Sequence, residues 1–221
     1  TISVQPWHET FEYYEQFSML FNLVQAAATG TTMPKAEVNG LYGPLILMPC
    51  SVYEQIGGHE AVRGSIIEDM ALARQLKNHS LPFRLYVGDR TIRYRMYAGG
   101  FKSLFEGWVK NAAWGATTIP LWHFVLVFLW VTSLTSVPYH LLVYSIARSL
   151  PGIAVYGALY IIWLIILRFL SKKFGKFKAC AIFLYPVGLA LMLLIYLVSL
   201  TKKLLRLPVS WRGRVIGEER L

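Results

Sequence analysis

Two adjacent carboxylates form the clearest chemical signal in this chain. Glu68 and Asp69 follow a glycine-bearing loop, and the spacing Ser65-x-x-Glu68 fits a capping box that opens a helix. The positive end of a helix dipole favours an ionised carboxylate, which can act as a general base if it reaches a substrate hydroxyl. Acidic residues are also common in first helical turns, so the pair alone leaves catalysis and a plain helix start both open.

The segments on either side would have to position this pair. Apolar residues at helical spacing predict a helix over 11–28, which is either core or rests on a membrane surface. The spacing Ser51-x-x-Glu54 fits another capping box, opening a short helix that stops at Gly57-Gly58. The helix that carries the acidic pair should run to about residue 79. Residues 83–87 and 91–97 predict two short strands joined by a Gly-Asp turn.

Residues 101–113 predict an amphipathic helix. Its apolar stripe includes Trp108, and Glu106 and Lys110 lie off the stripe at the spacing of an ion pair. A Trp-bearing stripe opposite lysines suits a helix lying in the membrane interface. An ordinary amphipathic helix packed on its own domain is the other interpretation.

The composition indicates a membrane protein. The 221 residues are 55% hydrophobic and only 15% charged, against about 25% charged residues in an average soluble domain. Three apolar segments, at about 121–146, 152–170 and 179–200, are each long enough for a crossing helix, which needs roughly 20 residues. Pro138 and Pro186 are expected to kink the first and the third.

The net charge of +10 favours anionic lipid headgroups over nucleic acid, because basic clusters flank the apolar segments and no nucleic-acid motif accompanies them. The lysines of 172–178 predict a cytoplasmic loop, which places the first half of the chain in the cytoplasm and the joint at Arg148 outside. Three full crossings would then put the basic tail outside. Either the tail breaks the positive-inside rule, or one apolar segment is re-entrant or interfacial.

The remaining candidates for metal or redox chemistry are weak. The two cysteines, Cys50 and Cys180, form no Cys-x-x-Cys pair, so neither zinc nor redox chemistry is indicated. His123 and His140 are expected at the membrane interface rather than as ligands.

The chain begins at Thr1 with a strand pattern, and we expect an N-terminal part of the domain to be missing.

The run YGPLILMPCSVYEQIGGHEAVRGSIIEDMALARQLKN, residues 42–78, resembles the second half of a family 2 glycosyltransferase domain with the GT-A fold. Such domains carry a glycine-containing acceptor segment, a helix ending in Gly-Gly, a Glu-Asp motif and a further helix. The resemblance implies an α/β fold, with residues 1–119 as the C-terminal half of that domain. Residues 120–200 would be its transmembrane helices and 201–221 a basic tail.

The resemblance also implies roles for single residues. Asp69 matches the catalytic base of the family, with Glu68 beside it. Trp108 matches the Trp of a Gln-x-x-Arg-Trp motif found in processive members. Leu104 and Gly107 replace its Gln and Arg, which favours transfer of a single sugar. The candidate substrate-binding residues are His8, Gly43, Pro44, Gly58, His59, Trp108 and Lys110. For His8 a surface position is an equal alternative, and for Trp108 and Lys110 the alternative is interface anchoring.

Four further motifs resemble the 4,4'-diaponeurosporenoate glycosyltransferase-like membrane enzymes: SVQPWH (3–8), YEQFSMLFN (14–22), RMYAGGFKSLFEGWVKNAAWGA (95–116) and VSWRGR (209–214). The resemblance implies a UDP-sugar donor, a lipid acceptor such as a carotenoid carboxylic acid, and direct displacement at the anomeric carbon. It also implies Mg2+ or Mn2+ in the full-length enzyme, although the Asp-x-Asp metal motif does not occur in these 221 residues.

Two alternatives stay open from the sequence. The first is a glycosyltransferase of the same fold acting on a polyprenyl phosphate, glycerolipid or sphingolipid. The second is a non-catalytic membrane anchor or transporter subunit. A transporter should carry intramembrane charges along a pathway. The predicted spans offer little beyond Arg168 near one end, which counts against transport.

Overall fold

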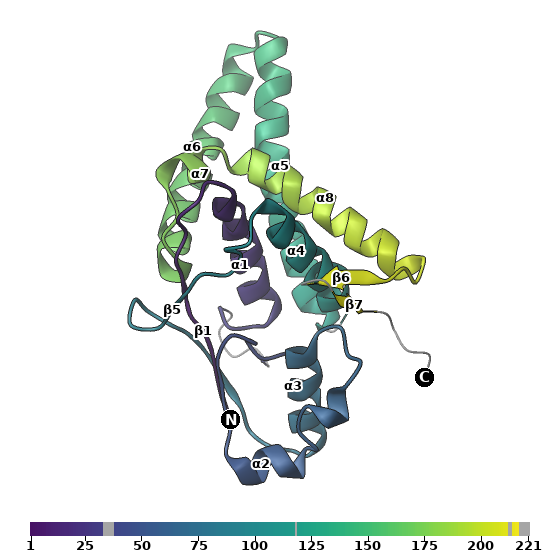
Figure 1. The fold of residues 1–221 in the computed structure, drawn as a ribbon. Coiled ribbons are helices and arrows are strands. Elements are labelled where there is room, and N and C mark those ends of the chain that lie inside the picture. The colour runs from purple at the N-terminus through teal and green to yellow at the C-terminus, as the bar shows by residue number, and fades with distance from the viewer. Residues whose placement is uncertain (33–37, 118, 212–213, 217–221) are drawn as a thin grey trace.

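The computed structural model describes residues 1–32, 38–117, 119–211 and 214–216, and it combines many helices with small sheets (Figure 1). The central strand β1 (Ile2–Gln5) pairs antiparallel with β3 (Ile46–Leu47) and parallel with β4 (Arg84–Val87). A second parallel pair joins β2 (Trp7–His8) to β5 (Arg93–Tyr94). Near the C-terminus, β6 (Val209–Trp211) and β7 (Arg214–Ile216) form an antiparallel pair.

The two strands predicted over 83–87 and 91–97 are therefore present as β4 and β5, in shorter form. Each pairs in parallel with an N-terminal strand rather than with the other. This parallel pairing brings the start of the chain beside the segment that follows the acidic helix. The sheet thereby joins parts of the chain more than 80 residues apart.

The predicted helix over 11–28 is correct in its second part only. The 3-10 helix η1 (Tyr14–Phe17) precedes the α-helix α1 (Ser18–Ala28). Most of α1 is buried, because it packs against long helices from the C-terminal half. Burial on several faces explains its unusually apolar sequence, and it places α1 in the core.

Both predicted capping boxes are wrong. Helix α2 (Cys50–Gln55) begins one residue before Ser51, after Pro49, and helix α3 (Glu68–Asn78) begins after Ile67; neither N-cap residue makes a side-chain hydrogen bond. In α3 the Asp69 carboxylate itself accepts the Met70 N–H, at 2.8 Å, and so satisfies one of the free N–H groups of the first turn. The predicted end of α2 is confirmed, since Gly57 and Gly58 both have positive φ angles.

Four long helices complete the molecule: α4 (Phe101–Ala116), α5 (Leu121–Ile146), α6 (Leu150–Phe174) and α8 (Tyr185–Leu204). The last three are long and apolar enough to cross a membrane. In Figure 1, α5 and α6 extend away from the sheet as a hairpin, while α8 runs obliquely beside α4. The largest core cluster contains residues from α1, α4, α5, α6 and α8.

The predicted third span over 179–200 needs correction. A short helix, α7 (Ala179–Phe183), ends before α8 begins at Tyr185. Pro186 lies in the first turn of α8, where a missing N–H costs no helical hydrogen bond, so it starts this helix instead of kinking it. Pro138 does lie inside α5, as expected.

His123, predicted at the membrane interface, makes its contacts inside the protein. Its side chain is fully buried near the start of α5, and its Nδ1 lies 3.4 Å from the amide nitrogen of Asn39. Asn39 in turn accepts a 2.6 Å hydrogen bond from Lys77 of α3. These contacts connect the first long apolar helix to the lobe that carries the acidic pair.

Candidate active site

Asp69 lies in the first turn of α3, as the sequence predicts, and its carboxylate faces the loop before β3. Its Oδ2 accepts the backbone N–H of Gly43 at 3.1 Å, while Oδ1 accepts that of Met70. A Cβ added to Gly43 would lie 3.0 Å from the same carboxylate oxygen, so a side chain there would press on it. The chain thus brings together the predicted base and the glycine of the predicted acceptor segment, 26 residues apart.

The electrostatic setting suits a proton acceptor. Burial raises the pKa of the Asp69 carboxyl, and the negative charge of Glu68 raises it further. The N–H groups of Met70 and Gly43 and the ammonium group of Lys110 act in the opposite direction, but the pKa stays above its ordinary value. A carboxylate with a raised pKa holds a proton more tightly and is the stronger general base.

Glu68 binds a lysine from a different element. The Nζ of Lys110, on α4, lies 3.2 Å from Oε2 of Glu68. The lysine side chain is only 11% exposed, whereas that of the glutamate is 50% exposed. This ion pair ties α3 to α4, and it places a positive charge next to the acidic pair. Lys110 is therefore held within the predicted site, while its contact with a substrate phosphate stays a prediction.

Gly58 and His59 lie in a separate structure at the end of α2. The Tyr53 hydroxyl bonds to the His59 ring at 2.8 Å and accepts its backbone N–H at 3.0 Å. A Cβ on Gly58, whose φ is +55°, would lie 2.6 Å from the Tyr53 ring, so only glycine fits here without strain.

A cavity of about 310 Å³ lies on this side of α3. His59, Tyr53 and Leu72 belong to its lining, together with residues of the β3 region. Asp69 is not among the lining residues, and Leu72 follows it by about one helical turn. Pro44 is exposed beside Gly43. Of the predicted substrate-binding residues, Gly43 and Pro44 thus lie beside the start of α3, whereas Gly58 and His59 lie at the end of α2.

Trp108 and His8 lie apart from this group. Trp108 is 3% exposed and stacks on Phe21 of α1 with ring centroids 4.2 Å apart. His8 is fully buried, with its Nδ1 2.9 Å from the Asn22 side chain, so the expectation of a surface position is wrong. Burial lowers the pKa of His8 to about 4, despite the nearby charge of Glu15. Both aromatic residues pack in the interior between sheet and helices.

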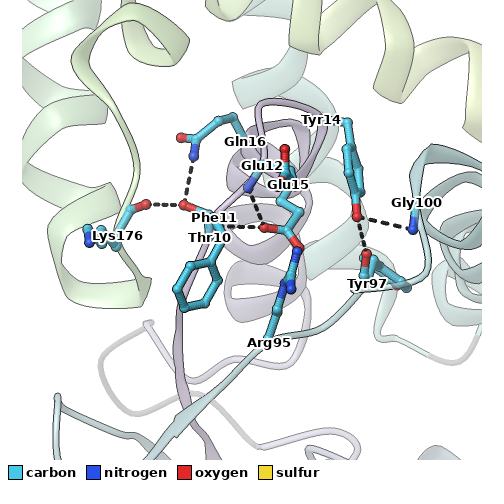
Figure 2. A network of polar contacts seen from close by, with 10 residues as sticks. All are labelled: Thr10, Phe11, Glu12, Tyr14, Glu15, Gln16, Arg95, Tyr97, Gly100 and Lys176. Atoms are coloured by element: carbon cyan, nitrogen blue, oxygen red, sulfur yellow. Dashed lines mark hydrogen bonds and ion pairs between the residues drawn. The ribbon is translucent and has the colours of Figure 1, made fainter.

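A polar network that no local sequence pattern predicts fixes the segment between β2 and α1 (Figure 2). The buried Glu15 carboxylate accepts the backbone N–H groups of Phe11 and Glu12, and it pairs with Arg95 at 2.6 Å. Burial alone would raise the pKa of Glu15, but these three contacts, with two backbone N–H groups and the Arg95 guanidinium, hold it below its ordinary value. Its partner Arg95 lies 80 residues away, at no spacing that a local pattern could reveal.

The same network reaches two other segments. Thr10 donates to the carbonyl of Lys176 and accepts from Gln16, whose Oε1 accepts the Lys178 N–H at 2.8 Å. Tyr14 donates to the Tyr97 carbonyl at 2.7 Å, just before α4 (Figure 2). The loop after α6 and the start of α4 are therefore both held by the residues that precede α1.

The far end of α4 is held by α8. The Ser199 hydroxyl donates to the carbonyl of Val109 at 2.6 Å and accepts the N–H of Ala113 at 2.9 Å. The hydroxyl is thus inserted between the Val109 carbonyl and the Ala113 N–H, in the helical turn that carries Lys110. Since Lys110 binds Glu68, packing of the apolar helix α8 positions the charge next to the acidic pair.

No group of three or more His, Cys, Asp or Glu side chains that could hold a metal ion occurs among the residues that the structure describes. The residues around Asp69 supply two carboxylates, one of them paired with Lys110, and do not form a cage for Mg2+. The metal expected for the full-length enzyme therefore has no ligand set in the described part of this chain.

This geometry can be compared with known proteins. The chain is similar to 4,4'-diaponeurosporenoate glycosyltransferase. The enzymes of that name from Staphylococcus aureus strains USA300 and NCTC 8325 / PS 47 are each 30% identical over 224 residues, which cover 96% of this chain. The enzyme from Staphylococcus haemolyticus strain JCSC1435 is 33% identical over 133 residues, covering 59% of this chain and 36% of the relative.

The chain spans 57% of the length of the Staphylococcus aureus relatives. All these relatives are named as glycosyltransferases, which supports the prediction of a transferase enzyme and of membership in a glycosyltransferase family. No protein-family model matches the chain. No solved structure matches it either.

Proposed function

We propose that this chain is the C-terminal part of a membrane-bound family 2 glycosyltransferase with the GT-A fold. The enzyme transfers a single sugar from a UDP-sugar to a lipid acceptor, and a carotenoid carboxylic acid is the acceptor we favour. The similarity to enzymes named for 4,4'-diaponeurosporenoate supports this acceptor class. The three long apolar helices support a lipid acceptor and a membrane location.

The observation that carries the proposal is the setting of Asp69. Its partly buried carboxylate has a raised pKa, and it faces Gly43 of the segment that resembles the family's acceptor-binding region. Lys110 couples the acidic pair to α4, which packs against the apolar helix α8. A base in this position lies where a water-soluble donor and a bilayer-soluble acceptor can meet.

In the proposed reaction Asp69 accepts the proton of the acceptor hydroxyl as its oxygen attacks the anomeric carbon of the donor. The bond between that carbon and the nucleotide breaks as the new glycosidic bond forms. Burial and Glu68 keep the pKa of Asp69 above its ordinary value, which favours proton transfer to it. Lys110 limits this rise and balances the charge of Glu68.

A carboxylic acid acceptor does not need a general base to deprotonate it. An unperturbed carboxyl has a pKa of about 4 and is already ionised near neutral pH. Asp69 would then orient the acceptor rather than deprotonate it, with Gly43 as a neighbouring contact. Mg2+ or Mn2+, held by residues outside the described part of this chain, would neutralise the diphosphate leaving group. No step assigned here to Asp69 depends on that ion.

The arrangement of α7 and α8 supports one orientation in the membrane. Tyr160, halfway along α6, donates to the carbonyl of Phe183 and stacks on Tyr185, so α8 begins beside the middle of α6. Its other end lies beside the end of α4, shortly before α5 begins, where Lys203 donates to the Thr117 hydroxyl at 2.5 Å. We propose that α5 and α6 cross the bilayer, and that α7 and α8 enter and return on one side.

This orientation resolves the charge conflict in the sequence. The basic loop of 172–178 and the basic residues 202–206 then share the cytoplasmic side, as the positive-inside rule requires. Non-helical backbone at membrane depth is tolerated when protein covers it, and Tyr160 does so at the break before α8. The catalytic lobe lies on the same cytoplasmic side.

The proposed activity can be tested with the full-length protein in detergent. It should be incubated with a panel of UDP-sugars and with lipid acceptors of three kinds: a carotenoid acid, a polyprenyl phosphate and a diacylglycerol. Mass spectrometry of the extracted lipids should show one added hexose on the carotenoid acid. Sugar on another lipid would correct the acceptor, and no glycosylated lipid with any donor would contradict the proposed function.

A further inference from the structure

We propose that a cavity between the β4–β5 loop and the end of α6 binds the phosphate group of an anionic ligand. The cavity measures about 570 Å³, within the range of small-molecule sites of about 300–1,000 Å³. Its lining includes Arg90, Lys172, Lys173 and the indole of Trp7. This site is distinct from the Asp69 region, and it does not depend on sugar transfer.

The three cations of this cavity have no carboxylate partner. Within the ranges that the structure describes, none of Arg90, Lys172 and Lys173 forms an ion pair. Two of them rest on aromatic rings instead: Arg90 lies 5.5 Å from the Trp7 ring, and Lys173 lies 4.8 Å from the Phe169 ring. Three uncompensated positive charges around one cavity attract an anion.

The one carboxylate in the lining is engaged by its own turn. Oδ1 of Asp89 accepts the backbone N–H of Thr91 at 2.9 Å and the Thr91 hydroxyl at 2.5 Å. These hydrogen bonds lower the pKa of Asp89 and shape the turn that presents Arg90. Asp89 therefore stabilises the β4–β5 loop, and its single negative charge leaves the cavity with a net positive charge.

The walls of the cavity are fixed to each other. The Trp7 indole N–H lies 3.4 Å from the carbonyl of Lys172, and β2 pairs with β5 on the other side of the loop. The Lys176 N–H donates to the carbonyl of His8 at 2.8 Å, just after the lysines. A preorganised site loses less conformational entropy when a ligand binds.

The position of the lysines identifies the kind of ligand. Lys172 and Lys173 form the last turn of α6, a helix apolar enough to cross a membrane. Basic residues at such a helix end lie at the level of the lipid phosphates. The phosphate group of an anionic lipid and that of a soluble compound offer the same chemistry, so the experiment must separate the two sources. Stabilisation of the helix dipole is a weaker explanation for the lysines, because it requires neither Arg90 nor a cavity.

The test compares two variants of equal charge. The cavity variant carries Arg90→Gln, Lys172→Gln and Lys173→Gln. The control carries Arg63→Gln, Arg74→Gln and Lys102→Gln, three exposed cations elsewhere on the molecule. Binding of a fluorescent short-chain phosphatidic acid to the full-length protein in detergent is followed by polarisation, with unlabelled phosphatidic acid, phosphatidylcholine and pyrophosphate as competitors.

We expect the cavity variant to bind phosphatidic acid at least about tenfold more weakly, because each of the three lost cations strengthens binding to an anionic lipid. The control should bind like the wild type. Competition by phosphatidic acid alone would assign the site to a lipid headgroup, and competition by pyrophosphate as well would extend it to soluble phosphates. Equal binding by the cavity variant and the wild type, or equal losses in both variants, would overturn the proposal.

Discussion

At the residue scale, the acidic pair shows how one local motif acquires two different environments. Asp69 turns toward Gly43 and becomes partly buried, while Glu68 stays exposed and pairs with Lys110. Adjacent positions on a helix point in different directions, so the two carboxylates meet different partners. This difference in environment supports assigning the base to Asp69 and a positioning role to Glu68.

His8 provides a test of stability against pH. Its folded pKa of about 4 lies below the ordinary value of 6.5, so protons bind the unfolded chain more tightly. Stability contributed by neutral His8 is therefore complete above pH 6.5 and decreases as the pH falls toward 4. The loss should reach roughly 3 kcal/mol, at 1.36 kcal/mol for each pKa unit.

Denaturant unfolding of the detergent-purified protein between pH 7 and pH 4 would measure this loss. The His8→Gln variant should lose less stability across that window, because glutamine does not titrate there. A variant whose pH dependence matched that of the wild type would show that buried His8 is not the group responsible.

At the scale of elements, the sequence of α4 allows two interpretations: a helix lying in the membrane interface, or an amphipathic helix packed on its own domain. Leu104 and Trp108 of its apolar stripe are buried, and Trp108 stacks on Phe21 of α1, while Phe101 at the helix start stays exposed. Since α8 is itself one of the apolar helices, α4 connects the lobe that carries Asp69 to a helix long and apolar enough to cross a membrane.

Trp108→Ala should destabilise the protein by about 3–5 kcal/mol, the usual cost of truncating a buried aromatic side chain. Trp108→Phe retains an aromatic ring and should cost less. Thermal unfolding in detergent would compare the three proteins. If Trp108 instead served mainly to bind substrate, its replacement by alanine would raise KM and leave the unfolding temperature unchanged.

Much of this architecture could be predicted from local patterns. The acidic helix, the stop at Gly57-Gly58, β4 and β5, and the two apolar helices α5 and α6 all follow from spacing and composition. The helix starts could not be placed, because Pro49 and the Asp69 carboxylate begin α2 and α3 in place of the expected serines. A capping pattern is defined by residue spacing alone, and it does not show which backbone N–H groups of the first turn lack a partner.

The contacts that complete the site were beyond local prediction. Gly43 and Asp69, Glu68 and Lys110, and Glu15 and Arg95 are separated by 26, 42 and 80 residues. Tertiary contacts such as the pairing of β1 with β4 and of β2 with β5 bring such distant segments together. The burial of His8, which excludes the alternative of a surface position, could not be predicted for the same reason, since it comes from β5 and from the loop at Gly175.

At the scale of the whole molecule, the proposed re-entrant path of α7 and α8 makes a prediction about sidedness. In a background with Cys50→Ser and Cys180→Ser, the variants Arg148→Cys and Arg206→Cys place one thiol at the joint of α5 and α6 and one after α8. A membrane-impermeant maleimide applied to intact cells should label the first variant, and it should label the second only after permeabilisation.

Labelling of the Arg206→Cys variant in intact cells would mean that α8 crosses the bilayer fully and that the basic tail breaks the positive-inside rule. The Arg148→Cys variant serves as the control for access from outside. Loss of labelling at that position would contradict the crossing of α5 and α6.

The most direct measurement of the proposed catalytic role is the transfer rate of the Asp69→Asn variant with a hydroxyl acceptor. Removing a general base should lower kcat by about 10²–10⁴-fold, since asparagine keeps the size of the side chain but accepts no proton. The control Glu60→Gln changes an exposed carboxylate paired with Arg63 and should keep the wild-type rate. A kcat of the Asp69→Asn variant equal to that of the wild type, in a protein that still inserts into membranes, would contradict the assignment of Asp69 as the base.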